Sequence, residues 1–385
     1  MKKTWIALAV LASAGTPYAQ SSVTLFGVVD TAIAHGRANG AGSANNTQMT
    51  SGNYSTSRIG FRGREDLGGG LSALFWLEAA VVSDDGRAGA ALTTNNQTAV
   101  AASGLNFSRR AVVGLAGPWG EVRLGRDVVP AHLNISGFDP FGNLGVGASV
   151  MPSVSSALGA PAATFGLVPA GQGSAGPLVR ASNMINYLLP QLNGLYGQAS
   201  YWLGENPGNG AANEDDGQGG GLRVGYAKGP FNVAAGWQRT TFRATPVATS
   251  AGAPSGDLVS WNIGGQWDLG TVRLMGVYGS NTRKSAVEAE GRGWTFGGIV
   301  PVGVGEIRAA LSQYRIDAGP GADPRARKAS LGYVHNLSKR TAIYTSVAHV
   351  RNSDGARLAL GGASYGAGVT NPRSTGFDVG IRHAF

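Results

Sequence analysis

The sequence predicts an all-β fold, a sixteen-stranded antiparallel up-and-down barrel that crosses a membrane with its strands. Segments of roughly 8 to 12 residues with alternating apolar and polar side chains recur from residue 22 to the end of the chain. The connections between these segments alternate between short turns and long loops. After the N-terminal segment, no apolar run reaches the length of about 18 residues that a transmembrane helix needs, so a membrane location requires strands.

The N-terminus, "MKKTWIALAVLASAGTPYAQSS", has the features of a secretory signal peptide. Two lysines form its basic region, an apolar stretch follows, and the small residue Ala19 precedes the predicted cleavage site. Pro17 departs from the pattern because a small residue is usual at that position. We therefore predict a signal peptide over 1–19 and a single barrel domain over 20–385; a short anchoring helix at the N-terminus is the alternative.

Sixteen segments have the alternation and the flanking Gly, Pro, Asn or Asp residues that are typical of strands. The predicted strands are 22–34, 57–66, 71–82, 106–116, 121–128, 179–189, 195–204, 221–228, 231–241, 258–267, 271–281, 292–300, 305–317, 326–336, 341–352 and 376–385. An even number of strands is the rule for bacterial outer-membrane barrels, so this number supports the predicted fold.

The connections predict the topology. Short turns lie at 66–70, 116–120, 190–194, 228–230, 268–270, 301–305 and 336–340, and long stretches lie at 35–56, 83–105, 129–178, 205–220, 242–257, 318–325 and 353–375. Up-and-down strands with tight turns at one rim and loops at the other produce this alternation, whereas Greek-key crossings do not. The stretch 129–178 is about fifty residues long and rich in Gly, Ala, Pro and Ser. Its residues alone leave open whether it is a functional loop or a flexible surface loop.

Side-chain parity separates an apolar face from a polar one. In "FDVGIRHAF", for example, Phe377, Val379 and Ile381 alternate with Asp378 and Arg382. A soluble barrel buries its apolar face, while a membrane barrel turns that face to lipid, so alternation alone does not decide between them. The signal peptide, the absence of cysteine, the alternating connections and the aromatic residues near strand ends together favour the membrane barrel. These aromatics are Trp119, Tyr187, Tyr201, Trp202, Trp237, Trp267, Tyr278 and Phe385.

The polar face carries more basic than acidic residues. The stretch "SRIGFRGREDLGGG" places Arg58, Arg62 and Arg64 on one face of a strand. By the same parity, the candidates for the lumen are the basic Arg58, Arg62, Arg64, Arg123, Arg180, Arg223, Arg273, Arg308 and Arg382 and the acidic Asp30, Glu78, Glu121, Glu306 and Asp378. This excess predicts a lumen that attracts anions; the alternative is a solvated face without selectivity. Arg109 and Arg126 break the parity, which either a bulge or a position beyond the lipid band explains.

The sequence contains no constellation typical of an enzyme, and we predict no catalytic residue, cofactor or metal site. Cysteine is absent, and the histidines, at 35, 132, 335, 349 and 383, show no metal-ligand spacing. "GQGSAG" matches G-x-G-x-x-G, but it runs into Pro177 rather than opening a helix. The arginines are spread over the whole chain, which argues against a nucleic-acid site. The acidic stretch 213–221 is either a solvated loop or a divalent-cation site at the rim.

Two other classes of function remain open from the residues alone. One is a membrane-barrel enzyme, which needs a serine, a histidine and an acidic group together at the outer rim. The other is a closed barrel that serves as an adhesin or an anchor. The scattered histidines argue against the enzyme, and the small inward residues Gly60, Ser72, Gly225 and Gly380 favour an open lumen over a filled one.

Several stretches between residue 22 and the C-terminus resemble hallmark stretches of the general porins of the outer membrane of Gram-negative β-proteobacteria. These are "SSVTLFGVVDTAI", "SRIGFRGREDLGGGLSALFWLE", "NFSRRAVVGLAGPWGEVRLGRD", "FDPFG", "LSKRTAIYTSVAHV" and "DVGIRHAF". The resemblance implies a passive, water-filled outer-membrane diffusion pore for small hydrophilic solutes and ions. It also implies a homotrimer in which each barrel has its own pore, with no catalytic activity.

The resemblance further implies how the pore is built. The third long loop, 129–178, folds inward and forms the constriction. Asp139 of "FDPFG" then faces an arginine cluster across the eyelet, and the predicted lining residues are Arg58, Arg62, Arg64, Arg123, Asp139 and Glu78. Because Asp139 is the only acidic residue of 129–178, we expect a preference for anions. The C-terminal Phe385 belongs to the signal that the barrel assembly machinery reads, and the other expected partners are outer-membrane lipid, lipopolysaccharide and inorganic anions.

Overall fold

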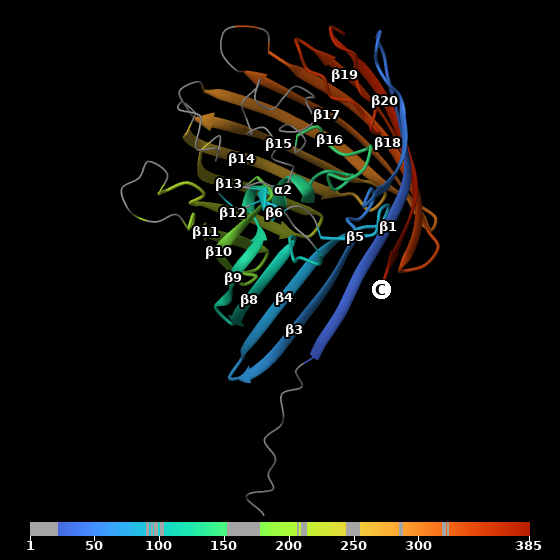
Figure 1. The fold of residues 1–385 in the computed structure, drawn as a ribbon. Helices are drawn as coiled ribbons and strands as arrows, with labels where there is room; N and C mark the ends of the chain where they lie inside the picture. Colours follow the sequence, from blue (N-terminus) through green and yellow to red (C-terminus); the bar gives the residue numbers. More distant parts are fainter. Residues whose placement is uncertain are drawn as a thin grey trace, which may run out of the picture.

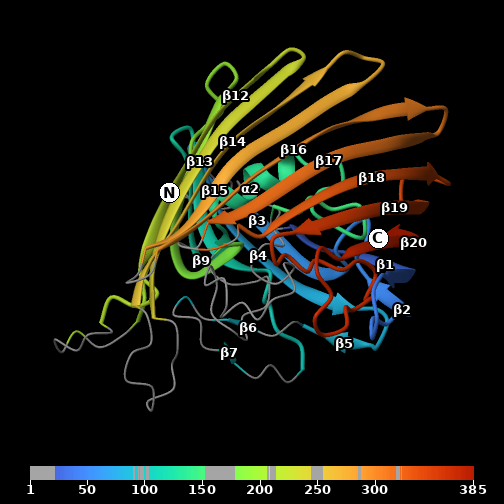
Figure 2. The same ribbon diagram turned by 90° about the horizontal axis from the view of Figure 1, so that it is seen from above.

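The computed structural model describes residues 22–89, 92–93, 95, 99–100, 104–151, 178–205, 208, 214–243, 255–284, 288–317, 321 and 323–385. Within these residues, sixteen long strands form one closed antiparallel barrel, which confirms the predicted fold class (Figures 1 and 2). The predicted signal peptide, 1–19, lies outside the described residues. No helix in the described part of the chain is both long and apolar enough to cross a membrane.

The barrel strands follow the predicted order along the chain. They are β1 (Ser22–Ala38), β3 (Arg58–Gly68), β4 (Leu71–Val82), β8 (Arg110–Gly117), β9 (Gly120–Val128), β10 (Arg180–Leu188), β11 (Leu195–Trp202), β12 (Gly219–Lys228), β13 (Phe231–Arg243), β14 (Ser255–Asp268), β15 (Arg273–Lys284), β16 (Ala289–Val302), β17 (Gly305–Asp317), β18 (Arg325–Asn336), β19 (Thr341–Ser353) and β20 (Arg373–Ala384). β4 and β17 have the predicted bounds, and most of the others differ from the prediction by one to four residues.

The barrel closes because β1 pairs with two partners. Its first half pairs with β3, and its second half pairs with β20 from Val28↔Ala384 to Ala38↔Ser374. At the seam, the backbone N–H and C=O of Gly27 exchange hydrogen bonds of 3.1 Å with those of Phe385. Every long strand therefore has a hydrogen-bonded neighbour on both sides, and no strand edge is left open to lipid among the described residues.

The connections contain smaller elements besides the sixteen barrel strands. β2 (Asn46–Ser51) pairs with the end of β1, β5 (Arg87–Ala88) pairs with β4, and β6 (Leu92–Thr93) pairs with β7 (Ala99–Val100). A short helix, α2 (Pro130–Gly137), opens the third long connection. The sequence did not predict these elements, since it placed loops at all of these positions.

The two faces of the barrel differ as predicted. In β20, Phe377, Val379 and Ile381 are 43%, 53% and 51% exposed, whereas Asp378 between them is fully buried. The apolar set therefore points away from the barrel interior, which is the arrangement of a barrel surrounded by lipid. Trp202 is fully buried, so its predicted place among the girdle aromatics is wrong. Several other predicted girdle aromatics are exposed on the outer surface, among them Tyr201, Trp237 and Trp267.

The two arginines that broke the parity have separate explanations. Arg109 precedes the first residue of β8, so strand alternation does not govern it. Arg126 follows Gly125, which has a φ of +129°, at a point where the register between β9 and β10 shifts. Two residues of β10 face Arg126 at this shift, and Arg126 is only 7% exposed. Its guanidinium donates hydrogen bonds to the Ser108 carbonyl and the Ser182 hydroxyl, each at 2.7 Å.

Candidate functional site: the constriction

The first half of the long third connection lies inside the barrel (Figure 2). Pro130 starts α2, which packs against the inner faces of β11 to β14. The Ala131 N–H donates to Gln238 Oε1 at 3.2 Å, and Asn262 Nδ2 donates to the Ala131 carbonyl at 2.9 Å. Arg223 Nε adds a hydrogen bond of 2.6 Å to Asn134 Oδ1. Polar wall residues therefore hold the helix against one half of the barrel.

The next segment of this connection, 138–151, is attached to the opposite group of strands. The Val146 N–H donates to Asp378 Oδ2 at 2.9 Å, and Lys328 Nζ donates to the Ala148 carbonyl at 2.5 Å. Further bonds reach Ser312 of β17 and Thr295 of β16. The inward-folded loop that the family resemblance implied is therefore present over 129–151, while the rest of the predicted constriction loop, 152–177, lies outside the described residues.

A second segment also enters the barrel, and the sequence analysis missed it. Residues 52–57, between β2 and β3, are held by Asp30, whose Oδ2 accepts the N–H groups of Tyr54 at 2.9 Å and Ser55 at 2.6 Å. The Tyr344 hydroxyl bonds to the other oxygen of Asp30. The sequence contained one signal for this second segment, since Asp30 and Asp378 were predicted to point inward. A buried carboxylate requires hydrogen-bond donors, and here another segment has to supply them.

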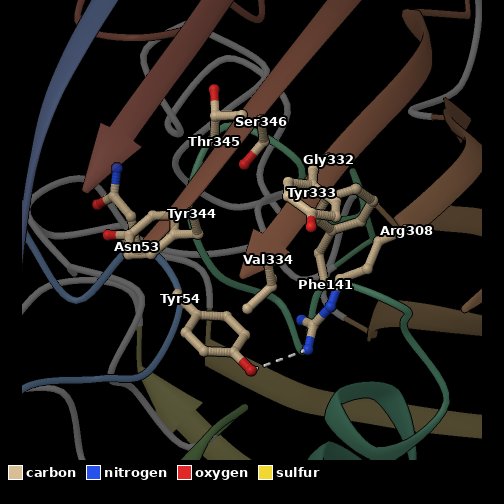
Figure 3. Close-up of a pocket in the computed structure, with 10 residues that line it drawn as sticks. All are labelled: Asn53, Tyr54, Phe141, Arg308, Gly332, Tyr333, Val334, Tyr344, Thr345 and Ser346. Carbon is tan, nitrogen blue, oxygen red and sulfur yellow. Dashed lines mark hydrogen bonds between the residues drawn. The ribbon is translucent and has the colours of Figure 1, made fainter. Parts of the chain in front are cut away.

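The two inward segments meet at Asp378 and around a small hollow. Asp378 Oδ2 accepts from Asn53 Nδ2 at 3.1 Å as well as from Val146, so one carboxylate joins both segments to β20. Figure 3 shows the hollow, where the Tyr54 hydroxyl accepts a 3.3 Å hydrogen bond from Arg308. The Arg308 guanidinium carbon lies 4.7 Å from the centre of the Tyr54 ring.

The facing part of the barrel carries eight arginines, which we call the arginine wall. They lie on or next to β3, β8, β9 and β10 and are Arg58, Arg62, Arg64, Arg109, Arg110, Arg123, Arg126 and Arg180. The predicted wall residues Arg58, Arg62, Arg64 and Arg123 are all in this group. Cross-strand registers connect its members: Arg64 pairs with Leu74, Leu74 with Gly114, and Gly114 with Arg123. The strands therefore place Arg64 and Arg123 on one inner surface. Arg109, Arg110 and Arg126 lie close enough to Arg180 to interact with it electrostatically.

Three carboxylates neutralise part of the arginine wall. Glu78, the predicted acidic lining residue, accepts from Arg109 Nε at 2.5 Å and lies 3.8 Å from Arg58 Nε. Arg110 Nε contacts Asp127 Oδ1 at 2.7 Å. Arg123 pairs with Glu121 and with Asp127. Eight guanidinium groups against three carboxylates leave a net positive surface, and none of these ion pairs involves Arg62 or Arg64 within the described residues.

Asp139 does not take the predicted position, so that prediction needs correction. Its side chain is 2% exposed, and its oxygens accept the backbone N–H groups of Phe141 at 3.0 Å, Asn143 at 3.1 Å and Ser149 at 2.9 Å. Burial raises the pKa of Asp139 above its ordinary value, and these hydrogen bonds and Lys328 oppose that rise. Asp139 shapes its own loop rather than facing the arginines, because three backbone N–H groups of that loop occupy its two oxygens.

A histidine of the inward loop, not an aspartate, is the titratable group influenced by the arginine wall. Burial lowers the pKa of His132 on α2 to about 3, and the nearby Arg180 and Arg109 contribute to that shift. The imidazole is therefore neutral at physiological pH, so it adds no charge to that of the arginines. Sequence analysis considered His132 only as a metal ligand, and no group of three or more potential metal ligands occurs among the described residues.

Arg382, also predicted for the lumen, lies close enough to Arg58 to interact with it electrostatically. Three other predicted lumen arginines have local roles. Arg223 supports α2, Arg308 pairs with Glu306 beside Tyr54, and Arg273 contacts Asp268 at 3.2 Å. These side chains lie along β12, β15 and β17, apart from the arginine wall. The wall and the two inward segments are therefore the candidate constriction of the barrel interior.

Comparisons with known proteins agree with this architecture. A profile of the family described as Gram-negative porin matches residues 5–355. Outer membrane porin protein 32 of Delftia acidovorans is 38% identical over 390 residues, and an outer membrane porin protein of Bordetella pertussis is 28% identical over 436 residues; both alignments cover 100% of each chain. The solved structure of the anion-selective porin from Comamonas acidovorans has a TM-score of 0.77 and 35% identity, over 95% of this chain and 100% of that chain. The chain belongs to the Gram-negative porin family and forms a β-barrel of the outer membrane.

Proposed function

We propose that the protein is a passive, water-filled diffusion pore for small hydrophilic solutes and ions and that it prefers anions. The observation that carries the preference is the arginine wall, in which eight guanidinium groups have three carboxylate partners. The nearby His132 is neutral, and the one acidic residue of the inward loop, Asp139, is occupied by its own backbone. The solved relative from Comamonas acidovorans is described as an anion-selective porin, which supports the same direction.

The attraction between the wall arginines and a passing anion is weak enough to allow conduction. A unit charge about 5 Å from an ion in fully hydrated surroundings contributes on the order of 1 kcal/mol. A few uncompensated arginines therefore raise the local concentration of anions several-fold without holding them. Conduction depends on this balance, because a tightly bound ion would block the pore.

The test is the reversal potential of the refolded protein in a planar lipid bilayer under a KCl gradient. We expect stepwise openings and a reversal potential on the chloride side. Arg62→Glu removes an unpaired positive charge from the lumen, so it should move the reversal potential toward zero. The control is Arg340→Glu, in the exposed turn between β18 and β19, which should shift it much less.

Other outcomes separate the competing functions. Open steps with reversal on the potassium side would refute the anion preference and keep the pore. Correctly inserted protein without any steps would favour a closed barrel with an anchoring role. The relatives are porins, which are channels rather than enzymes, and the proposal assigns no catalytic residue to the chain.

The proposal assigns the pore lining to Arg58, Arg62, Arg64, Arg123 and Glu78. It also includes residues 1–19 as a cleaved signal peptide, 20–385 as one domain, a homotrimeric assembly, and contacts with lipopolysaccharide and outer-membrane lipid. The family resemblance supports these parts, since porins of this class share them.

Phe385 is proposed as part of the signal for the barrel assembly machinery. Its side chain is 45% exposed, and its ring packs directly against Gly27. A Cβ at position 27 would lie only 2.3 Å from that ring. Deleting Phe385 should lower the amount of folded protein in the outer membrane of intact cells severalfold. The purified variant should still refold in detergent, because one pair of seam hydrogen bonds is a small part of the barrel. Equal loss in both settings would contradict a recognition role and indicate a structural one.

A further inference from the structure

Arg62 differs from the other members of the arginine wall in what its guanidinium group contacts. Arg58, Arg109, Arg110 and Arg123 each have a carboxylate within 4 Å. Arg62 is exposed to the lumen and has no carboxylate or hydrogen-bond acceptor among the described residues. Its contacts are aromatic instead, since its guanidinium carbon lies 5.2 Å from the ring centre of Phe26 and 5.4 Å from that of Trp76.

The two rings form a corner that positions this group. Phe26 on β1 and Trp76 on β4 lie 5.6 Å apart between ring centres, with an interplanar angle of 83°. Arg62 stands on β3 between them, directly opposite Trp76 in the strand register. Gly60 makes room for this arrangement, because a Cβ at that position would lie 2.4 Å from the Phe26 ring. The corner is therefore built by three neighbouring strands and a glycine.

The chemistry of this arrangement favours one class of anion. A guanidinium group is a planar fork whose N–H groups match the two oxygens of a carboxylate. Contact with aromatic rings orients the fork, so less side-chain entropy is lost when an anion binds. A chloride ion is spherical and gains nothing from the fork beyond its charge. Arg64, two residues along the same strand, has the same charge and exposure but no aromatic contact within the described residues.

We infer that Arg62, oriented by Phe26 and Trp76, is a carboxylate-binding site in the lumen that makes the pore favour carboxylate anions over halides. The inference rests on the proposed function, because it requires an open lumen that admits anions. A single fork in a hydrated lumen binds weakly, so a carboxylate held there still leaves and passes through. The remaining arginines of the wall attract anions by charge, and Arg62 adds discrimination by shape.

The test measures permeability for formate relative to chloride from bi-ionic potentials with potassium as the common cation. Arg62→Lys keeps the charge and loses the fork. We expect the ratio of formate to chloride permeability to fall at least twofold, with the reversal potential in a KCl gradient unchanged. Arg64→Lys makes the same change at a wall arginine that has no aromatic contact among the described residues, so it should lower the formate ratio less than Arg62→Lys does. Arg340→Lys, in the exposed turn between β18 and β19, is the control and should leave both quantities at their wild-type values.

A second variant tests the role of the rings. Phe26→Leu keeps Arg62 but removes one wall of the corner, so it should lower the formate ratio in the same direction; Trp76 is left in place because its ring also lies 4.4 Å from the Arg110 guanidinium carbon. A wild-type ratio in both Arg62→Lys and Phe26→Leu would overturn the inference, as would an equal fall in Arg64→Lys. A potassium-side reversal of the wild-type protein would instead refute the proposed anion preference, so the two failures are distinguishable.

Discussion

Replacing Asp378 with alanine is expected to release both inward segments from the barrel wall and to make the open-channel current fluctuate between several levels. The carboxylate is fully buried and joins β20 to Asn53, Val146 and Ser346. Each buried donor left without an acceptor costs about 1–3 kcal/mol. The two segments lie on the path through the barrel, so their release changes the width of that path. Single-channel recording in a planar bilayer measures the fluctuation.

Asp378→Asn provides the matched control. The asparagine carbonyl oxygen still accepts from Asn53 and Val146, and its amide group donates to the Ser346 hydroxyl in place of the original bond. This variant removes the same charge but keeps the connection, so its current should remain as steady as that of the wild type. Equal current fluctuation in both variants would mean that the loss of charge causes it. That result would contradict the role of Asp378 in joining the two inward segments to β20. A steady current in both would mean that other contacts hold the segments.

The barrel was predictable because its signals are local. Strand alternation has a period of two, and each turn contains its own glycine, proline or asparagine. β4 and β17 therefore match their predicted bounds, and the side of the strand taken by Arg58, Arg62 and Glu78 follows from counting along the chain. The same counting failed at Arg126, which shares the parity of Leu124 but is only 7% exposed, beside a register shift between β9 and β10.

The inward segments were not predictable because contacts distant in sequence hold them. α2 has eight residues, no acidic or basic residue at the favourable end, and no side-chain cap. Its position depends on Arg223, Gln238 and Asn262, which lie about a hundred residues further along the chain. A short helix without its own stabilising pattern is formed by packing rather than by propensity.

Asp139 shows the limit of transferring a role by resemblance. The motif "FDPFG" correctly marks the inward loop, and the aspartate lies within it. Three backbone donors of the same loop occupy its oxygens, which parity and composition do not reveal. Loop conformation decides whether a carboxylate faces the lumen or its own backbone, and loops lack the periodicity that fixes side-chain direction in strands.

Replacing Glu78 with glutamine is expected to increase the anion preference of the pore. Glu78 is the shared partner of Arg109 and Arg58, so its loss exposes two arginines whose charges it now offsets. An added uncompensated charge about 5 Å from a passing ion is worth on the order of 1 kcal/mol, which raises the permeability ratio of chloride to potassium by up to about fivefold. The reversal potential in a KCl gradient should therefore move further to the chloride side.

Glu78→Gln should also lower the stability of the folded barrel while it raises the preference for anions. Removing one member of a largely buried ion pair typically costs about 3–5 kcal/mol, because the other charge stays behind without a partner. Glu78→Gln should therefore lower the temperature at which the folded barrel loses its strand signal in circular dichroism. Arg109→Gln should shift the reversal potential in the opposite direction, and the double variant should return it close to the wild-type value. A reversal potential that moves toward potassium in Glu78→Gln would mean that Glu78 acts on ions through some route other than its arginine partners. The paired carboxylates of the wall thus stabilise the barrel at the expense of selectivity. Arg62 and Arg64, which have no carboxylate partner in the described part of the chain, carry the charge that ions meet.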